Sequence, residues 1–217
     1  MKYDGIIFDL DWVLVDVSKS YREAIRQTAG YFLNREVSIG EVNQIKNKAG
    51  MNNDCEATYK LLNKPGISYK KVKSYFQKLY LGNTKSKGLI DNEKLLISKS
   101  NLQKLKEKYR KLGIATGRPK KEAKYVIEKN KLENIFDCII ALEDVKKGKP
   151  APDMLLATID KMRLKNTVYI GDSPSDVIAA KASGIPCFYV GKLNIGTIKF
   201  QSLLEVIKYL LWKEIQK

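Results

Sequence analysis

The stretch YDGIIFDLD, residues 3–11, is a short apolar run that ends in two acidic residues. An apolar run of this length between charged residues predicts a buried strand that ends at Asp9. Residues two apart in an extended backbone face the same side, so we expect Asp9 and Asp11 to point toward the same space. The stretch therefore predicts a strand whose carboxyl end carries functional side chains.

Beyond residue 85 the sequence alternates between short apolar runs and amphipathic helical stretches. Further strands are expected at residues 112–115, 136–141, 167–172 and 186–190. Strands that alternate with helices predict a parallel sheet covered by helices on both faces. We therefore expect an α/β fold with a Rossmann-like parallel sheet core, in which ligands bind at the carboxyl ends of the strands.

Between the first strand and the rest of the core, the pattern is helical. Helices are expected at residues 20–34, 38–48, 54–62 and 68–81. Ser20 and Glu23 have the spacing of a capping box at the first of these helices. Because no strand intervenes, we expect an inserted α-helical cap domain at residues 17–84, with the core formed by residues 1–16 and 85–217.

Acidic residues follow two of the expected strands. Asp9 ends the first strand and Asp172 ends the strand at 167–172, while Asp176 lies in the first turn of the following helix. Gathering these carboxylates at one sheet edge is unfavourable because they repel one another. A divalent cation removes that cost, and oxygen ligands without His or Cys indicate magnesium.

Groups that favour an anion occupy other ends of the same sheet. Thr116 offers a hydroxyl, and Gly117 allows backbone N–H groups to approach a ligand closely. Pro119 suits the first position of a helix, whose N-terminus would then face the same place. Lys149 lies just before Pro150, at another helix start. Acids for a metal and donors for an anion together predict a phosphate site.

Composition excludes several classes of enzyme. The 217 residues include no histidine, which excludes Ser-His-Asp and Cys-His hydrolases and His-ligated zinc sites. The three cysteines are widely spaced, which argues against a disulfide framework and fits a reducing compartment. No apolar stretch is long enough to span a membrane, and the first residues lack the layout of a signal peptide, so we expect a cytoplasmic protein.

The formal net charge is +16, from 40 Lys and Arg against 24 Asp and Glu. Such a charge attracts nucleic acids and phosphorylated metabolites alike. Most of the positive residues are lysines scattered along helices without a basic and aromatic array, which favours solvated helix faces over a nucleic-acid interface. The expected partner is a small phosphorylated metabolite, with neither a membrane nor nucleic acid, and the oligomeric state is left open.

Four motifs, in this order, resemble those of the haloacid dehalogenase (HAD) superfamily. The quoted segments are FDLDWVL (residues 8–14), Thr116-Gly117, KPAPD (residues 149–153) and GDSPSD (residues 171–176). The resemblance covers the core, and the helical segment is similar to the cap of the phosphoglycolate-phosphatase-like branch. It implies a magnesium-dependent phosphatase that hydrolyses a small phosphomonoester such as phosphoglycolate, a sugar phosphate, histidinol phosphate or a nucleotide.

The resemblance also implies a role for each matching residue. Asp9 would be the nucleophile that takes the phosphoryl group, and Asp11 would act first as general acid and then as general base. The residues implied to hold the phosphoryl oxygens are Thr116, Gly117 and Lys149. The residues implied to hold magnesium are Asp9, Asp11 through its backbone carbonyl, and Asp172, with Asp176 helping directly or through water.

Trp12 stands where the resembled family usually has glycine. A tryptophan there would strain the turn, shift the Asp11 carbonyl, cover the substrate pocket or only narrow its entrance. Side chains expected to contact substrate are Trp12, Arg22, Asn52, Asn53 and Arg118. Two alternatives stay open: a phosphomutase that retains the phosphoryl group on Asp9, and a non-catalytic protein that binds nucleic acid or phosphate with its pocket blocked by Trp12.

Overall fold

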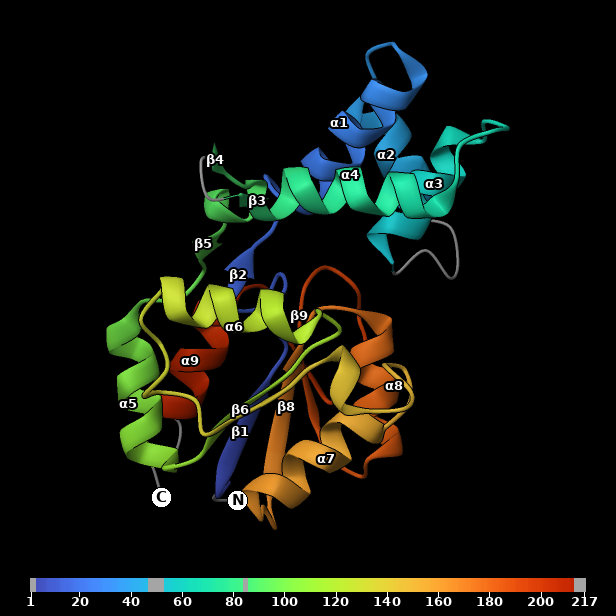
Figure 1. Ribbon diagram of the computed structural model, residues 1–217. Helices are drawn as coiled ribbons and strands as arrows, with labels where there is room; N and C mark the ends of the chain where they lie inside the picture. The colour runs from blue at the N-terminus through green and yellow to red at the C-terminus, as the bar shows by residue number, and fades with distance from the viewer. Residues whose placement is uncertain (1–2, 47–52, 84–85, 213–217) are drawn as a thin grey trace. The chain divides into compact units, whose positions relative to one another are not determined.

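The computed structural model describes residues 3–46, 53–83 and 86–212 (Figure 1). Its contacts divide the chain into two compact units. The core unit contains residues 1–15 and 95–217, and the helical unit contains residues 16–94. The short strands β2 (Val15–Asp16) and β5 (Lys94–Leu95) pair with each other where the chain passes from one unit to the other.

A six-stranded sheet forms the centre of the core unit (Figure 1). Its strands are β1 (Gly5–Phe8), β6 (Leu112–Ala115), β7 (Cys138–Ile140), β8 (Thr167–Gly171), β9 (Cys187–Val190) and β10 (Ile198–Phe200). They lie in the order β10-β9-β8-β1-β6-β7, and all neighbouring pairs are parallel. The predicted α/β fold with a parallel sheet is confirmed, and β10 is a strand that the sequence pattern does not indicate.

Helices cover both faces of the sheet. The helices of the core unit are α5 (Lys99–Tyr109), α6 (Lys120–Lys129), α7 (Asp153–Met162), α8 (Pro174–Ala182) and α9 (Leu203–Trp212). On one face, α7 and α8 pack over a buried cluster that includes Tyr169 and Cys187. Phe188 points to the opposite face, where its ring contacts Tyr209 of α9, and α5 lies beside α9.

The end of α9 is held by two side chains of α5. Lys108 Nζ donates a hydrogen bond to the Leu210 carbonyl oxygen at 2.8 Å. The buried Tyr109 hydroxyl donates to the same oxygen at 2.7 Å. These two donors give the Leu210 carbonyl the hydrogen bonds that it lacks within its own helix, because the last turn of a helix leaves its carbonyls without an intrahelical partner.

In the described ranges, no helix is both long enough and apolar enough to cross a membrane.

Four helices make up most of the helical unit: α1 (Tyr21–Leu33), α2 (Ile39–Lys46), α3 (Asp54–Leu62) and α4 (Tyr69–Leu81). They are followed by a hairpin of β3 (Gly82–Asn83) and β4 (Ser86–Lys87) and by the 3₁₀ turn η1 (Leu89–Asn92). η1 packs against α1 and α4, so residues up to 94 lie with the helical unit. The stacked rings of Tyr21 and Tyr80, 4.4 Å apart, join α1 to α4.

The start of α1 differs from the expected capping box. Ser20 Oγ donates to the Val17 carbonyl oxygen at 3.2 Å, and among the described residues its side chain accepts no hydrogen bond from the helix. Glu23 pairs with Arg26 of the same helix at 2.6 Å. The backbone of Ser20, with ψ −81°, lies outside the extended geometry of a capping residue, so this prediction is wrong.

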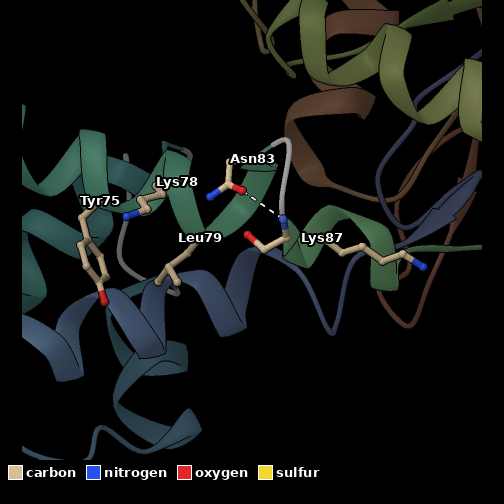
Figure 2. Close-up of a pocket in the computed structure, with 6 residues that line it drawn as sticks. Tyr75, Lys78, Leu79, Asn83 and Lys87 are labelled. Carbon is tan, nitrogen blue, oxygen red and sulfur yellow. Dashed lines mark hydrogen bonds between the residues drawn. The ribbon is translucent and has the colours of Figure 1, made fainter.

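A surface pocket of about 240 Å³ lies beside α4 and the hairpin of the helical unit (Figure 2). Its lining residues are Tyr75, Lys78, Leu79, Asn83, Ser86 and Lys87. Asn83 Oδ1 accepts a hydrogen bond from the Ser86 backbone N–H at 3.0 Å, which closes the hairpin beside the pocket. None of the predicted site residues that the structure describes lines this pocket.

Candidate active site

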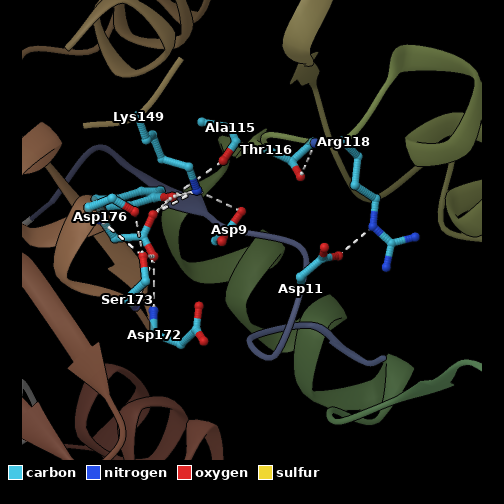
Figure 3. A network of polar contacts seen from close by, with 11 residues as sticks. Asp9, Asp11, Ala115, Thr116, Arg118, Lys149, Asp172, Ser173 and Asp176 are labelled. Carbon is cyan, nitrogen blue, oxygen red and sulfur yellow. Dashed lines mark hydrogen bonds and ion pairs between the residues drawn. The ribbon is translucent and has the colours of Figure 1, made fainter. Parts of the chain in front are cut away.

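The acids and donors predicted at the strand ends gather at one edge of the core sheet (Figure 3). Asp9 follows β1, Thr116 follows β6 and Asp172 follows β8, and β1 lies between the other two strands. Lys149 reaches the same edge from the segment before α7. Because parallel strands present their carboxyl ends at one edge, residues far apart in the chain meet there.

Three carboxylates of this edge lie close enough to share a cation. Oxygen atoms of Asp9, Asp172 and Asp176 all lie within 4.8 Å of one another. Asp9 is 7% exposed and Asp176 is fully buried, so water screens their repulsion poorly. A set of hard oxygen ligands fits magnesium, which prefers carboxylates.

Burial perturbs these acids strongly. It raises the pKa of Asp9 to about 7 against the opposing attraction of Lys149, with Asp176 and Asp11 adding repulsion. It also raises the pKa of Asp172 to about 8, with further repulsion from Asp9 and Asp176. A bound cation favours the charged forms of such acids. The metal-free site therefore holds protons that a cation would displace.

Lys149 is the positive centre of the cluster. Its Nζ lies 2.9 Å from Asp9 Oδ1 and 2.6 Å from Asp176 Oδ1, and it donates to the Tyr169 hydroxyl at 2.8 Å. Burial acts to lower the pKa of Lys149, but the Asp9 and Asp176 carboxylates more than offset burial and raise it. The ammonium group therefore stays charged, with each of its three N–H donors directed at an oxygen atom.

Asp176 is held in place by donors on both carboxylate oxygens. Oδ1 accepts from Lys149 and, at 2.9 Å, from the Tyr169 hydroxyl. Oδ2 accepts from the Asp172 N–H at 3.2 Å and from the N–H and hydroxyl of Ser173 at 3.0 and 2.7 Å. Burial alone would raise the pKa of Asp176, but Lys149 and these donors lower it. These hydrogen bonds occupy most of the lone pairs of the Asp176 carboxylate. Asp9 and Asp172 are therefore better placed than Asp176 to bind a metal ion directly.

The GDSPSD segment has a local reason for its sequence. Ser173 and Asp176 form a capping box at the start of α8, with Pro174 at the first helical position. A Cβ atom at Gly171 would lie 2.5 Å from the Asp176 Cβ, so only glycine lets the end of β8 approach this side chain. The cap and the glycine together fix Asp176 against the strand end.

Asp11 lies to one side of the acid cluster, paired with Arg118 (Figure 3). Arg118 Nε donates to Asp11 Oδ1, and the Arg118 side chain is 1% exposed. The Arg118 backbone N–H donates to Thr116 Oγ1 at 3.2 Å, which orients that hydroxyl. A Cβ at Gly117 would meet no atom of the described residues within 4 Å, so its backbone lies open to them. The predicted acid–base residue and the predicted phosphate-binding segment therefore lie side by side.

Trp12 adopts a left-handed backbone conformation, with φ 59°. Its N–H donates to the Val15 carbonyl oxygen at 2.8 Å, which closes the turn after Asp11. A non-glycine residue in this conformation costs about 1–2 kcal/mol, a strain that glycine avoids. The Trp12 side chain is 40% exposed.

The remaining predicted contact residues belong to the helical unit. Arg22 Nη1 donates to Asn43 Oδ1 at 2.6 Å, which ties α1 to α2. Asn53 caps α3 by accepting from the N–H groups of Cys55 and Glu56 at 3.0 and 3.2 Å. Asn52 lies outside the described residues. The structure thus gives Arg22 and Asn53 local roles in holding helices.

Tyr169 is a site residue that the sequence reasoning missed. It lies in β8, is fully buried, and its hydroxyl contacts Lys149 and Asp176. The available signal was a phenol three positions before Asp172, in a strand whose other large side chains are aliphatic.

Residues 6–190 match a family model described as haloacid dehalogenase-like hydrolase. An imidazoleglycerol-phosphate dehydratase of Phytophthora nicotianae is 30% identical over 195 residues, which cover 86% of this chain but 43% of that protein. The chain thus spans less than half the length of that relative. A phosphorylated carbohydrates phosphatase of Thermotoga maritima is 28% identical, with 96% of this chain and 100% of the relative covered.

Solved structures share the fold. A HAD-superfamily hydrolase of subfamily IA from Geobacter sulfurreducens superimposes with a TM-score of 0.74 at 20% identity, covering 95% of each chain. CbbY from Rhodobacter sphaeroides, in complex with phosphate, gives a TM-score of 0.73 at 16% identity, covering 94% of this chain and 96% of the other. At these identities the likeness shows the fold alone.

Proposed function

The chain belongs to the haloacid dehalogenase-like hydrolases, and we propose that it is a magnesium-dependent phosphatase that acts on a small phosphomonoester through an aspartyl-phosphate on Asp9. The observation that carries this proposal is the cluster at the sheet edge. There, the buried ammonium group of Lys149 pairs with both Asp9 and Asp176. Oxygen atoms of Asp9 and Asp172 also lie close enough together to bind one metal ion. A nucleophile, a cation site and a fixed positive charge are the parts that phosphoryl transfer needs.

In the first half of the proposed reaction, an Asp9 carboxylate oxygen attacks the phosphorus atom of the ester. The bond between phosphorus and the ester oxygen breaks, and its electron pair leaves with that oxygen. Asp11 gives the oxygen its proton, so the product is an alcohol. Arg118, which pairs with Asp11, fixes the orientation of the Asp11 carboxyl group.

In the second half, water attacks the phosphorus atom and gives its proton to Asp11. The bond between phosphorus and the Asp9 oxygen breaks, which restores the Asp9 carboxylate and releases inorganic phosphate. Asp11 thus recovers the proton that it gave to the leaving oxygen. One titratable group serves both halves, which suits a site without histidine.

Charge stabilisation comes from groups already in place. Lys149 and Thr116 lie at the same sheet edge as Asp9, and in this proposal they hold the phosphoryl oxygens, so that little reorganisation is needed when charge develops there. Magnesium, held by Asp9 and Asp172 beside Asp176, would neutralise negative charge on the phosphoryl group and on the acids.

The proposed substrate class is a small phosphorylated metabolite. The relative from Thermotoga maritima, matched over its whole length, is named for the dephosphorylation of phosphorylated carbohydrates, which supports a sugar phosphate. The net charge of +16 favours anionic substrates in general.

The test is phosphate release from a panel of sugar phosphates, phosphoglycolate, nucleotides and para-nitrophenyl phosphate, with magnesium or with EDTA. The variants are Asp9→Asn and, as a matched control, Asp160→Asn on the exposed side of α7. We expect magnesium-dependent turnover in the wild type and in the control, and none in Asp9→Asn. Turnover in Asp9→Asn, or turnover that EDTA leaves intact, would overturn the proposal. No phosphate release, with a sugar phosphate converted to its isomer when a sugar bisphosphate is added, would indicate a mutase.

A further inference from the structure

The hydroxyl of Tyr169 is buried at the centre of the site. It accepts a hydrogen bond from Lys149 Nζ at 2.8 Å and lies 2.9 Å from Asp176 Oδ1 and 3.3 Å from the Ala115 carbonyl oxygen. Its single proton is available to these two acceptors. The Tyr169 hydroxyl thus links the Lys149 ammonium group to the Asp176 carboxylate and to the end of β6.

Packing alone does not require this hydroxyl. In the sheet, Tyr169 pairs with Ile7 of β1 and Cys187 of β9, and all three belong to one buried apolar cluster. A phenylalanine ring would fill the same space. A buried phenol is stable only where its hydroxyl finds partners, and the two partners nearest to this hydroxyl are the charged groups Lys149 and Asp176.

We propose that Tyr169 is a positioning residue that holds Lys149 for the phosphorylated state of Asp9, an inference that rests on the proposed phosphatase function. In the free enzyme the three N–H donors of Lys149 point at Asp9, Asp176 and Tyr169. Once Asp9 carries a phosphoryl group, the donor that pointed at Asp9 turns to a phosphoryl oxygen. Asp176 and Tyr169 then hold the ammonium group by its other two donors.

Tyr169→Phe removes one of these two anchors and keeps the ring. Lys149 then keeps Asp9 and Asp176 as partners in the free enzyme, but once Asp9 is phosphorylated only Asp176 anchors it besides the phosphoryl oxygen that it holds. We therefore expect the loss to fall on the phosphorylated state and on the transition states that form and hydrolyse it, because Lys149 holds a phosphoryl oxygen in all of them. Because the lost hydrogen bond was made to a charged group, we expect kcat to fall by roughly ten- to a hundredfold. KM should stay near the wild-type value.

A matched control separates positioning from packing. Tyr109→Phe also removes a buried tyrosine hydroxyl of the core unit, one that donates to Leu210 in α9 and not to the site. We expect both variants to unfold at lower temperature than the wild type, and only Tyr169→Phe to lose kcat. Both are assayed well below their unfolding midpoints, so that loss of fold is not read as loss of rate.

A second measurement does not depend on turnover. Beryllium fluoride bonds to a carboxylate oxygen and mimics a phosphoryl group, so its binding with magnesium can be followed by fluorine NMR. We expect Tyr169→Phe to bind it at least about tenfold more weakly than the wild type and Tyr109→Phe to bind it equally.

The outcomes distinguish the two proposals. If the wild type turns over no phosphomonoester but binds beryllium fluoride more tightly than Tyr169→Phe, the proposed reaction fails and the positioning role stands. If Tyr169→Phe matches the wild type in kcat or in beryllium fluoride affinity, the positioning role is wrong whatever the panel shows.

Discussion

Asp9→Asn should abolish turnover and at the same time stabilise the metal-free protein. The substitution keeps the shape of the side chain and an oxygen that can accept from Lys149. It removes one negative charge from a buried cluster that also holds Asp172 and Asp176. The ionised form of Asp9 is needed for nucleophilic attack, but burial makes that form costly in the absence of a cation.

The magnitude follows from the pKa of Asp9, which burial raises from 3.8 to about 7. At about 1.4 kcal/mol per pKa unit, this amounts to about 4 kcal/mol. The folded state binds the Asp9 proton more tightly than the unfolded chain does, so protonation of Asp9 stabilises the folded wild type. This stabilisation is complete below pH 3.8 and is lost as the pH rises to about 7. Asn does not titrate, so the advantage of the variant grows over that range and then stays constant.

The assay is unfolding in EDTA at about pH 5 and about pH 8, with Asp160→Asn as control. We expect Asp9→Asn to gain about 1–2 kcal/mol at the lower pH and about 4 kcal/mol at the higher, where the unfolding midpoint should rise by roughly 8–16 °C. Saturating magnesium should reduce or reverse the difference, because it binds the wild type more tightly. A variant no more stable than the wild type at about pH 8 in EDTA would show that attraction by Lys149 outweighs burial, and would refute the reasoning.

Three further predictions concern the same cluster. Lys149→Met should abolish turnover and destabilise the protein by about 3–5 kcal/mol in denaturant unfolding, because it leaves buried Asp9 and Asp176 without their cation; a loss below about 1 kcal/mol would contradict this. Ser173→Ala, which removes the α8 cap, should lower stability by about 1 kcal/mol, and an unchanged thermal midpoint would count against the cap. Calorimetry should show magnesium affinity rising between about pH 6 and pH 8, with proton release, as Asp9 and Asp172 ionise; a pH-independent affinity would exclude these ligands.

The parallel sheet was predictable because its strands are short apolar runs that end in polar residues. Asp9, Thr116 and Asp172 each follow such a run, and parallel topology brings the ends of the runs together. β10 was not predictable in the same way, since Ile198-Lys199-Phe200 is a three-residue edge strand with a charged centre. Its pairing with β9 depends on tertiary contacts rather than on local pattern.

Side-chain partnerships were harder to predict than positions. The sequence places Arg118 two residues after Thr116, but the ion pair with Asp11 depends on how β1 and β6 lie together. Tyr169 has the same difficulty, because its hydroxyl reaches Lys149 across the sheet edge. At Ser20 the sequence has the spacing of a capping box, but the backbone of Ser20 does not adopt the extended geometry that a capping residue needs.

The aspartyl-phosphate on Asp9 is tested most directly by Asp11→Asn with para-nitrophenyl phosphate in magnesium. Nitrophenolate leaves without a proton from Asp11, whereas attack by water on the phosphorylated enzyme needs Asp11 as base. We predict a burst of about one nitrophenolate per protein molecule, followed by slow turnover, with the phosphoryl group found by mass spectrometry on the acid-quenched peptide that contains Asp9. A wild type that turns over, with neither a burst nor a phosphorylated Asp9 peptide in the variant, would contradict the mechanism.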